Sequence, residues 1–286
     1  MNRGMKRFFI ICAIAVGAGL ILAVAGFAAG GLQSIDKLAA KYDWIHGSPG
    51  KTQYLQLDED EKFQAVRIEG AMDVRICSDN KSMVRIAYGE NEETPELYVE
   101  DGVLKAIAGD EFDGAVINLS GKSSTPVLEI YCERDQLLKE IDVQIDYGDV
   151  EMEGISLGSI RINADYGDVS FDQVEFDSAD IEAACGDIDG FDVISGGLRV
   201  KAAYGSCDLA GTLQGVTDIS MDNGDVILET SLAESRYTIE AQGASGDMSI
   251  GDQSWEGYEN HCSYGSGPNT IRIRSDYGDV DVSFSE

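Results

Sequence analysis

Basic residues are scarce in this sequence of 286 residues, where 21 Lys and Arg stand against 52 Asp and Glu and the formal net charge is −31. A surface this acidic repels nucleic acids and anionic lipids and favours association with cations. The low basic content therefore excludes nucleic acid as a partner. The 43% hydrophobic content, in regular alternation, excludes a disordered acidic tail.

Residues that carry catalysis are also few. The two histidines, His46 and His261, have no zinc-ligand spacing, and no phosphate-binding loop is present. The six cysteines are irregularly spaced without a C-x-x-C pair, which predicts buried free thiols, with a Cys185–Cys207 bridge as the alternative. We therefore expect no enzyme activity and no catalytic residues. A polysaccharide lyase or glycosidase is the rival class, but the coils offer only scattered basic groups to stabilise a developing negative charge.

The amino terminus contains the one long apolar run. Residues 1–31 hold three basic residues, Arg3, Lys6 and Arg7, followed by 24 uncharged residues from Phe8 to Gly31. A helix of that length spans a bilayer, and the basic flank keeps the amino terminus in the cytoplasm. The sequence predicts a single-pass cell-membrane protein, anchored through residues 8–31, whose acidic bulk is extracellular. A signal peptide cleaved after Ala23-Val24-Ala25 is the alternative.

Glycine is abundant, and it recurs with a fixed period. A corner of the form Gly-Asp-hydrophobic returns every 19 residues and then at longer intervals of 22 and 32 residues. The corner glycines are Gly148, Gly167, Gly186, Gly205, Gly224, Gly246 and Gly278. Such a repeat indicates a stack of similar structural units.

Between corners the apolar residues alternate with period two, as in Ile160, Ile162 and Ala164, and the phase slips by one after the glycine. Each unit is thus predicted to be two strands joined at a bend that glycine permits, stacked on the next unit about 4.8 Å away. The predicted fold is all-β: a single-stranded, parallel β-helix-like β-solenoid with about 19 residues per coil, preceded by one transmembrane helix. An antiparallel sandwich is the competing interpretation.

The predicted organisation has four parts. They are the cytoplasmic stub and anchor (1–31), a juxtamembrane linker (32–53), irregular β opening coils that act as a cap (54–140), and regular coils (141–286) with an inserted loop near 251–268. Within the opening coils, Asp101-Gly102 is a hairpin signal.

The corner aspartates are predicted to form a ladder along one edge: Asp149, Asp168, Asp187, Asp225 and Asp279. One interpretation is that they cap the turns by accepting backbone hydrogen bonds. The other is weak Ca²⁺ binding between neighbouring carboxylates, although the nonapeptide typical of calcium-binding solenoids is absent. No other cofactor is expected.

A second row of equivalent positions holds Tyr147, Tyr166, Tyr204 and Tyr277. Their parity places them with the buried residues, so we expect them to pack inside, whereas exposed tyrosines would bind glycan or peptide. In the inserted loop, Trp255, Tyr258 and Tyr264 are the predicted ligand contacts.

Taken with the apolar amino terminus, the recurring corners, from Gly148-Asp149-Val150 to Gly278-Asp279-Val280, resemble a family of adhesin-like β-strand-repeat proteins. This is a domain of unknown function found in Gram-positive cell envelopes, and the resemblance covers about residues 50–286, with Gly205-Ser206-Cys207 departing from the pattern. It implies a surface-exposed solenoid that works in adhesion or in envelope-stress sensing and scaffolding. Its partner would be cell wall, glycan or another envelope protein.

Overall fold

The computed structural model describes residues 52–57, 61–89, 94–109, 125–133 and 137–285. The predicted anchor and nearly all of the linker lie outside these residues. Among the residues that are described, no helix has both the length and the apolar character needed to cross a membrane.

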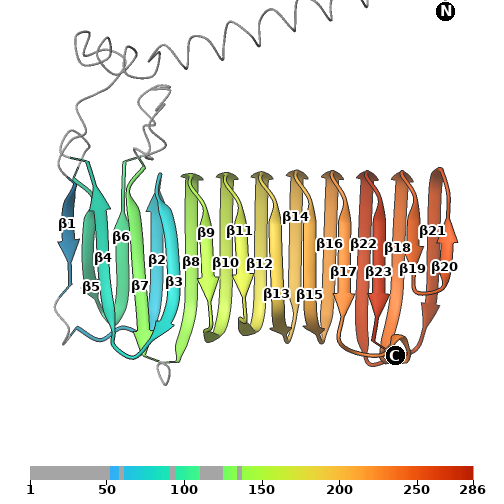
Figure 1. The fold of residues 1–286 in the computed structure, drawn as a ribbon, viewed down its shortest axis with the longest axis horizontal. Helices are drawn as coiled ribbons and strands as arrows, with labels where there is room; N and C mark the ends of the chain where they lie inside the picture. Colours follow the sequence, from blue (N-terminus) through green and yellow to red (C-terminus); the bar gives the residue numbers. More distant parts are fainter. Residues whose placement is uncertain (1–51, 58–60, 90–93, 110–124, 134–136, 286) are drawn as a thin grey trace, which may run out of the picture. The chain divides into compact units, whose positions relative to one another are not determined.

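The described residues form 23 strands of one mixed β-sheet and a single short 3-10 helix (Figure 1). The opening strands are β1 (Gln53–Gln56), β2 (Ala65–Gly70), β3 (Asp73–Asp79), β4 (Met83–Tyr88), β5 (Glu96–Glu100), β6 (Val103–Ile107) and β7 (Val127–Glu133). The regular strands are β8 (Leu138–Tyr147), β9 (Val150–Glu153), β10 (Ser156–Tyr166), β11 (Val169–Asp172), β12 (Glu175–Cys185), β13 (Ile188–Ser195), β14 (Leu198–Tyr204), β15 (Cys207–Leu213), β16 (Val216–Asn223) and β17 (Val226–Thr230). The last elements are η1 (Glu234–Arg236), β18 (Tyr237–Ser245), β19 (Met248–Ile250), β20 (Gln253–Trp255), β21 (Tyr258–Gly265), β22 (Asn269–Tyr277) and β23 (Val280–Phe284).

The regular strands stack in rungs, where a rung is a pair of consecutive strands joined at a corner glycine. Ile160 of β10 pairs in parallel with Ile141 of β8 and with Ala179 of β12, each 19 residues away. The second strands of the rungs follow the same offset, as Val169 of β11 does with Val150 of β9. The all-β prediction and the 19-residue stacking are therefore confirmed for the rungs from β8 to β17.

The corner glycines lie in a column along the stack, and this position explains why each corner is a glycine. Their φ angles fall between 127° and 145°, a region that residues with a side chain rarely adopt. A Cβ built on Gly186 would lie only 2.0 Å from the carbonyl oxygen of Gly167 in the rung below. Each corner therefore rests directly on the backbone of the next, and only glycine satisfies both conditions.

The core runs along the inside of the stack. Ile162, Ile181 and Val200 occupy one buried column of the first strands, and Val169 continues the buried set after the corner. Each such side chain contributes roughly 1.5–3 kcal/mol by leaving water. Because neighbouring rungs cover one another, the buried residues form one continuous cluster.

The order of the last rungs differs from the prediction. The sequence order places Gly246 next to Gly224, but Gly278 lies on Gly224 and Gly246 lies on Gly278. The carboxyl-terminal rung β22–β23 is thus inserted between β16–β17 and β18–β19. The first rung, β2–β3, is inserted in the same way between β6–β7 and β8–β9. As a result, β2–β3 and the carboxyl-terminal rung β22–β23 are each paired on two sides.

Charges on the outer face favour this order. From β2 to β18, one position of the first strands alternates between basic and acidic, and its residues in spatial order are Arg67, Asp142, Arg161, Asp180, Arg199, Asp218, Arg272 and Glu240. In the order of the sequence, Asp218 would instead lie beside Glu240, and like charges on adjacent strands destabilise a sheet. Inserting β22 places Arg272 between the two acids, 2.9 Å from the Glu240 carboxylate.

We expect Arg272→Glu to lower the free energy of unfolding by about 1–2 kcal/mol, because three acidic side chains would then occupy consecutive rungs. Arg272→Gln, which removes the attraction without adding repulsion, should cost about half as much. The measurement is urea unfolding of the full chain in detergent at low and high salt. Equal losses for the two variants, unaffected by salt, would argue against the electrostatic explanation.

The ends of the stack are closed by antiparallel strands, so the fold is not a wholly parallel solenoid. At one end β5 pairs with β6 and β4 with β7, and the Asp101-Gly102 hairpin is confirmed between β5 and β6. At the other end β20 pairs with β19 and β21 with β18. The inserted loop predicted near 251–268 is therefore wrong in its central part, because residues 253–255 and 258–265 are the strands β20 and β21.

Candidate functional site

The corner aspartates form a hydrogen-bonded ladder, as the turn-capping interpretation requires. The Oδ1 atom of Asp149 accepts the backbone N–H of Asp168 at 2.9 Å, and Asp168 accepts that of Asp187 at 2.8 Å. The ladder continues from Asp187 to the N–H of Ser206, and in the last rungs it runs from Asp225 to Asp279 and on to Asp247. Each carboxylate thereby caps the corner of the neighbouring rung.

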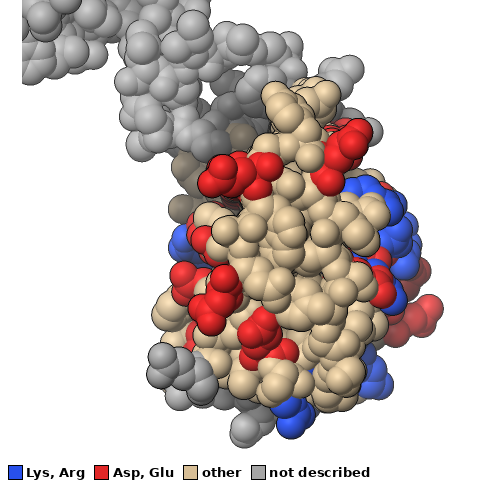
Figure 2. Space-filling view, turned by 90° about the vertical axis from the view of Figure 1, so that its right-hand side faces the viewer, with Lys and Arg blue, Asp and Glu red and all other residues tan. Residues whose placement is uncertain are grey.

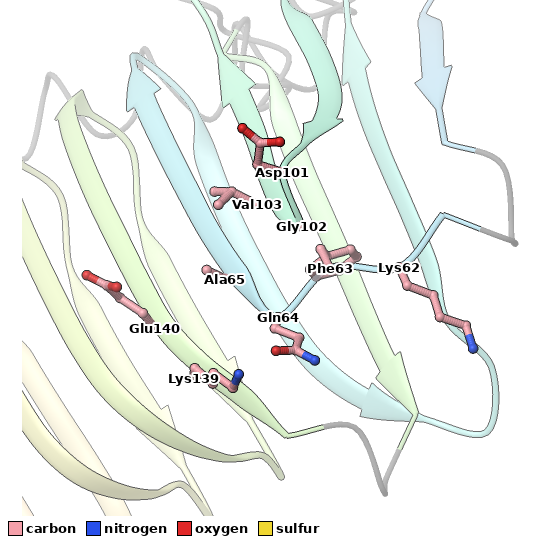
Figure 3. A pocket seen from close by; sticks show the side chains of 9 residues that line it. All are labelled: Lys62, Phe63, Gln64, Ala65, Asp101, Gly102, Val103, Lys139 and Glu140. Atoms are coloured by element: carbon pink, nitrogen blue, oxygen red, sulfur yellow. The ribbon is translucent and has the colours of Figure 1, made fainter.

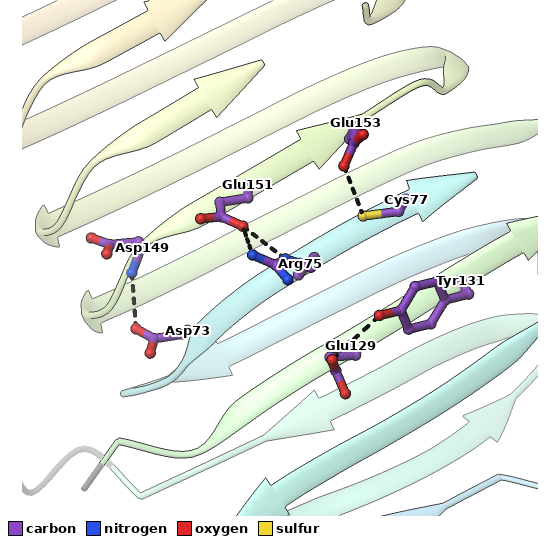
Figure 4. Close-up of polar contacts among 8 residues, drawn as sticks. All are labelled: Asp73, Arg75, Cys77, Glu129, Tyr131, Asp149, Glu151 and Glu153. Carbon is purple, nitrogen blue, oxygen red and sulfur yellow. Dashed lines mark hydrogen bonds and ion pairs between the residues drawn. The ribbon is translucent and has the colours of Figure 1, made fainter. Parts of the chain in front are cut away.

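The ladder begins where the opening strands meet the regular rungs (Figure 4). Asp73 of β3 accepts the N–H of Asp149 at 3.2 Å, and Arg75 donates from two nitrogens to Glu151 at 2.8 and 2.6 Å. Partial burial raises the pKa of the Asp73 carboxyl, while the N–H that it accepts acts in the opposite direction. Charge-assisted hydrogen bonds thus join β3 to the first regular rung, whose paired residues lie 76 positions further along the sequence.

Substitutions of Asp187 test whether the ladder stabilises the fold through its hydrogen-bond acceptors or through its charge. Asp187→Ala should lower the free energy of unfolding by about 1–2 kcal/mol, because the N–H of Ser206 loses its charged acceptor. Asp187→Asn keeps an Oδ1 acceptor and relieves repulsion between rungs, so we expect a loss below about 0.5 kcal/mol. Urea unfolding of the full chain measures both. If asparagine were as damaging as alanine, the negative charge and not the acceptor would be the stabilising feature.

Asp189 gives the stack a pH dependence. Partial burial raises its pKa, and the carboxylates of Asp187, Asp208 and Asp168 add to the effect. The folded chain therefore binds this proton more tightly than the unfolded chain, and the contribution to stability falls as pH rises through the folded pKa. Because the Asp189 side chain is exposed and solvent screens most of this effect, we expect Asp189→Asn to gain only about 0.5 kcal/mol at neutral pH, and nothing at a pH low enough to protonate both states. A gain independent of pH would contradict this assignment.

The tyrosine row lies outside the stack, contrary to the prediction. Tyr147, Tyr166, Tyr204 and Tyr277 are exposed, because the alternation of buried and exposed residues ends just before the corner, after Ala164 in β10. The ladder is irregular at the same place, since Ala164 and Tyr166 are paired with the next rung but the residue between them is not. Tyr147 stacks on Tyr166 with ring centroids 5.1 Å apart and planes 8° from parallel.

The three predicted ligand contacts lie at the end of the stack that β20 and β21 close. Tyr258 of β21 is 80% exposed, and Trp255 of β20 is half-buried against the core. The hydroxyl of Tyr264 donates to Glu234 at 2.8 Å, and burial together with this carboxylate raises the pKa of Tyr264. Figure 2 looks onto this end and shows a mostly uncharged surface with scattered acidic side chains, and with basic side chains toward its edges. Tyr258 is the cross-strand partner of Ser245, so it continues the tyrosine row. This continuation is not apparent from the order of the residues in the sequence.

Two of the described cysteines, Cys132 and Cys207, are poor nucleophiles. All five are free thiols, so the alternative of a Cys185–Cys207 bridge is not present. Burial raises the pKa of Cys132 and of Cys207 to about 12. The reactive species is the thiolate, which these two residues do not form at neutral pH.

A hollow of about 350 Å³ lies near the other end of the stack (Figure 3). Its lining comes from β2 and the residues before it, from the β5–β6 turn and from the start of β8: Lys62, Phe63, Gln64, Ala65, Asp101, Gly102, Val103, Lys139 and Glu140. None of these is a His, Cys, Ser or Thr. The hollow therefore lacks the Ser–His and Cys–His pairs that activate a hydroxyl or thiol nucleophile.

The part of the chain that the structure describes contains no preformed metal site, since none of its groups of three or more His, Cys, Asp or Glu is placed to hold an ion. The ladder carboxylates use Oδ1 for the backbone bonds, and their Oδ2 atoms take no part in them. Weak Ca²⁺ binding by the ladder stays a prediction.

Comparison with solved structures finds proteins of low sequence identity. A candidate cell adhesion protein from Clostridium sporogenes is 14% identical, with a TM-score of 0.35, and the match covers 82% of this chain and 99% of that one. A candidate adhesin from Bacteroides fragilis is 11% identical, with a TM-score of 0.45 and the same two coverages. A candidate adhesin from Parabacteroides distasonis is 12% identical, with a TM-score of 0.36, covering 82% of this chain and 98% of that one. None of the curated proteins matches this sequence.

A protein-family comparison is more direct. The model of the family described as Toastrack DUF4097 matches residues 53–283, which is nearly everything from the first strand to the last. The matched region holds the glycine column, the aspartate ladder and the tyrosine row. The chain belongs to the Toastrack DUF4097 family.

Proposed function

We propose that this protein is a membrane-anchored, extracytoplasmic β-solenoid with a non-catalytic binding role. The observation that carries the proposal is repetition: within the described residues, the glycine, aspartate and tyrosine positions recur on rung after rung along a rigid stack. Catalysis needs different groups that converge on one point, whereas an extended partner is bound by a surface that repeats. The role that fits is adhesin-like contact with cell wall, glycan or an envelope protein.

The apolar run at 8–31 supports the anchored location. Its three preceding basic residues favour a cytoplasmic amino terminus, and the strongly acidic remainder suits an aqueous compartment outside the cell. In this arrangement the stack is held near the membrane and presents its outer faces to the envelope. A role as a sensor or scaffold in envelope stress uses the same geometry with a membrane protein as the partner.

Protease treatment of intact bacteria that express the full chain tests the location. We expect external protease to digest the stack while a cytoplasmic marker survives, and the intact membrane fraction to retain peptides from residues 1–31. Digestion only after lysis would overturn the extracellular assignment, and a mature chain beginning near Gly26 would overturn the anchor.

The binding role is tested by sedimentation of the detergent-solubilised full chain with purified cell-wall fragments. Adhesin-like function predicts co-sedimentation that saturates, whereas a chain that crosslinks in living cells to a membrane protein and ignores the wall supports the sensor or scaffold role. Turnover of a polysaccharide would overturn the non-catalytic assignment.

Weak Ca²⁺ binding along the aspartate ladder is the second candidate, and the unused Oδ2 atoms favour it. Calorimetry of the full chain should then give heat at millimolar Ca²⁺, with less heat for Asp187→Asn. Absence of heat and of any change in melting temperature would remove this candidate.

A further inference from the structure

The tyrosine row has a regular period that appears only in the spatial order of the rungs. From the β10 rung onward, tyrosine alternates with a small residue at each step of the stack. The tyrosines, in spatial order, are Tyr166, Tyr204, Tyr277 and Tyr258. The residues between them are Cys185, Asn223 and Ser245.

Exposure follows the same alternation. The four tyrosines are 52%, 59%, 64% and 80% exposed along the row, whereas the three intervening residues are partly buried. The Asn223 side chain folds back onto the preceding rung, where its amide donates to the carbonyl of Ala203 at 3.3 Å. The row is therefore a series of exposed aromatic rings separated by smaller, less exposed side chains.

The row is held in place by the rungs beneath it. On β10, β14 and β22 the tyrosine is followed directly by a corner glycine, whose φ and backbone contact fix the local conformation. Tyr147 stacks against Tyr166 and ends the alternation on that side. A surface of this kind is preorganised, so a ligand that matches its period binds without ordering the protein.

Acidic side chains line both edges of the row. Asp165, Asp222 and Asp276 precede their rung's residue in the row and are exposed. On the other side runs the aspartate ladder, whose carboxylates are fixed by the bonds to the neighbouring rungs. A partner that lies on the rings between these edges is attracted if it is cationic and repelled if it is anionic.

The spacing selects the conformation of the partner. Tyrosines two rungs apart are separated by about 9.6 Å, since parallel strands lie about 4.8 Å apart. A polyproline II helix repeats every three residues, or about 9.3 Å, and aromatic surfaces are a known mode of recognition for it. In an extended β-strand, residues on one face recur every 6.8 Å or so, which does not match the row.

We propose that the tyrosine row binds a basic, proline-rich peptide segment in the polyproline II conformation, aligned with the stack. Every third residue of the segment packs on a tyrosine, and Lys or Arg side chains between them reach the carboxylates at the edges. Four tyrosines span about 29 Å, which corresponds to about ten residues of polyproline II. This inference rests on the proposed binding function and names the class of its partner.

The test uses a fluorescent peptide of four Lys-Pro-Pro repeats and the full chain in detergent, with binding followed by fluorescence anisotropy. We expect saturable binding that weakens as salt rises. Glu-Pro-Pro repeats, which reverse the charge, and Lys-Gly-Ser repeats, which lack the preformed helix, should bind at least about tenfold more weakly.

The decisive variant is Tyr204→Asn with Tyr277→Asn, because asparagine already occupies the equivalent position at Asn223. Peptide affinity should fall about tenfold or more. The matched control, Tyr54→Asn with Tyr98→Asn, removes two exposed tyrosines outside the row and should change affinity less than twofold. Asp165→Asn with Asp276→Asn should weaken binding and flatten its salt dependence.

Three results would overturn the inference. They are no binding of the Lys-Pro-Pro peptide, equal losses in the row variant and its control, and binding of neutral β-linked oligosaccharides at the row in place of the peptide. The last result would keep the row as a binding surface and the proposed function as it stands. If the stack resisted external protease on intact bacteria and the chain did not sediment with cell-wall fragments, those results would count against the proposed function itself.

Discussion

Gly186→Ala is expected to lower the free energy of unfolding by about 4 kcal/mol or more, or to prevent folding of the rungs around it. Two costs act together. The φ of 145° is strained for alanine, and the new Cβ would lie 2.0 Å from the carbonyl oxygen of Gly167. Separating the rungs to relieve this contact would also break the bond from the Gly167 N–H to the carbonyl of Cys185. Urea unfolding of the full chain measures the loss.

Two other glycines separate these costs. Gly102 has a φ of 76° with open space around its Cβ position, so Gly102→Ala carries only the backbone strain, about 1 kcal/mol. Gly158 has no strained φ, but its Cβ would lie 2.4 Å from the carbonyl oxygen of Lys139, so Gly158→Ala carries only the contact, about 1–3 kcal/mol. If all three variants lost similar stability, the column of corners would not be the special feature of the fold.

Deleting residues 269–286 is expected to unfold residues 237–265 as well, although these remain in the chain. The deletion removes β22 and β23, which lie between β16–β17 and β18–β19. Without them, β18 would have to dock on β16 with Glu240 beside Asp218, while the hairpins to β20 and β21 alone are too small to be stable. The rungs from β8 to β15 should persist, because each rung is stabilised mainly by its neighbours.

Hydrogen exchange measured by mass spectrometry tests this deletion. Peptides from residues 237–265 should lose protection, and peptides from residues 138–185 in the same molecule serve as the internal control. Protection retained throughout 237–265 would show that these residues do not need the carboxyl-terminal rung and would argue against its inserted position.

The repeating part of the fold was predictable because its determinants are local. The 19-residue glycine spacing and the period-two alternation define each rung, and the structure places Gly148, Gly167, Gly186 and Gly205 in the predicted column. The aspartate ladder followed from the same spacing. Its detailed chemistry did not, since a carboxylate that accepts the N–H of the next rung depends on how two rungs are stacked.

The tyrosine row was misplaced because parity fails just before the corner. Alternation predicts a buried side chain two residues after Ala164, but Asp165 and Tyr166 are both exposed and the ladder is irregular at Asp165. The acidic residues on either side of Tyr147, Tyr166 and Tyr277 were the available signal, since a ring between two solvated carboxylates seldom packs in a core.

The spatial order of the last rungs required non-local information. Spacings of 22 and 32 residues show that the repeat is interrupted, but they do not say which rung lies on which. The alternating charges contained that information, because only the inserted order places Arg272 between Asp218 and Glu240. The terminal strands β20 and β21 were concealed for a related reason: aromatic and glycine residues typical of a loop also suit the exposed edge of a sheet.

The inserted order, on which both the charge alternation and the tyrosine period depend, is tested most directly by disulfide trapping. Positions 223 and 277 are paired on adjacent rungs, whereas 223 and 245 lie two rungs apart. A disulfide needs Cα atoms within about 7 Å, which adjacent rungs satisfy and a separation of about 9.6 Å does not. In the full chain, Asn223→Cys with Tyr277→Cys should crosslink and Asn223→Cys with Ser245→Cys should not. The opposite pattern would contradict the account.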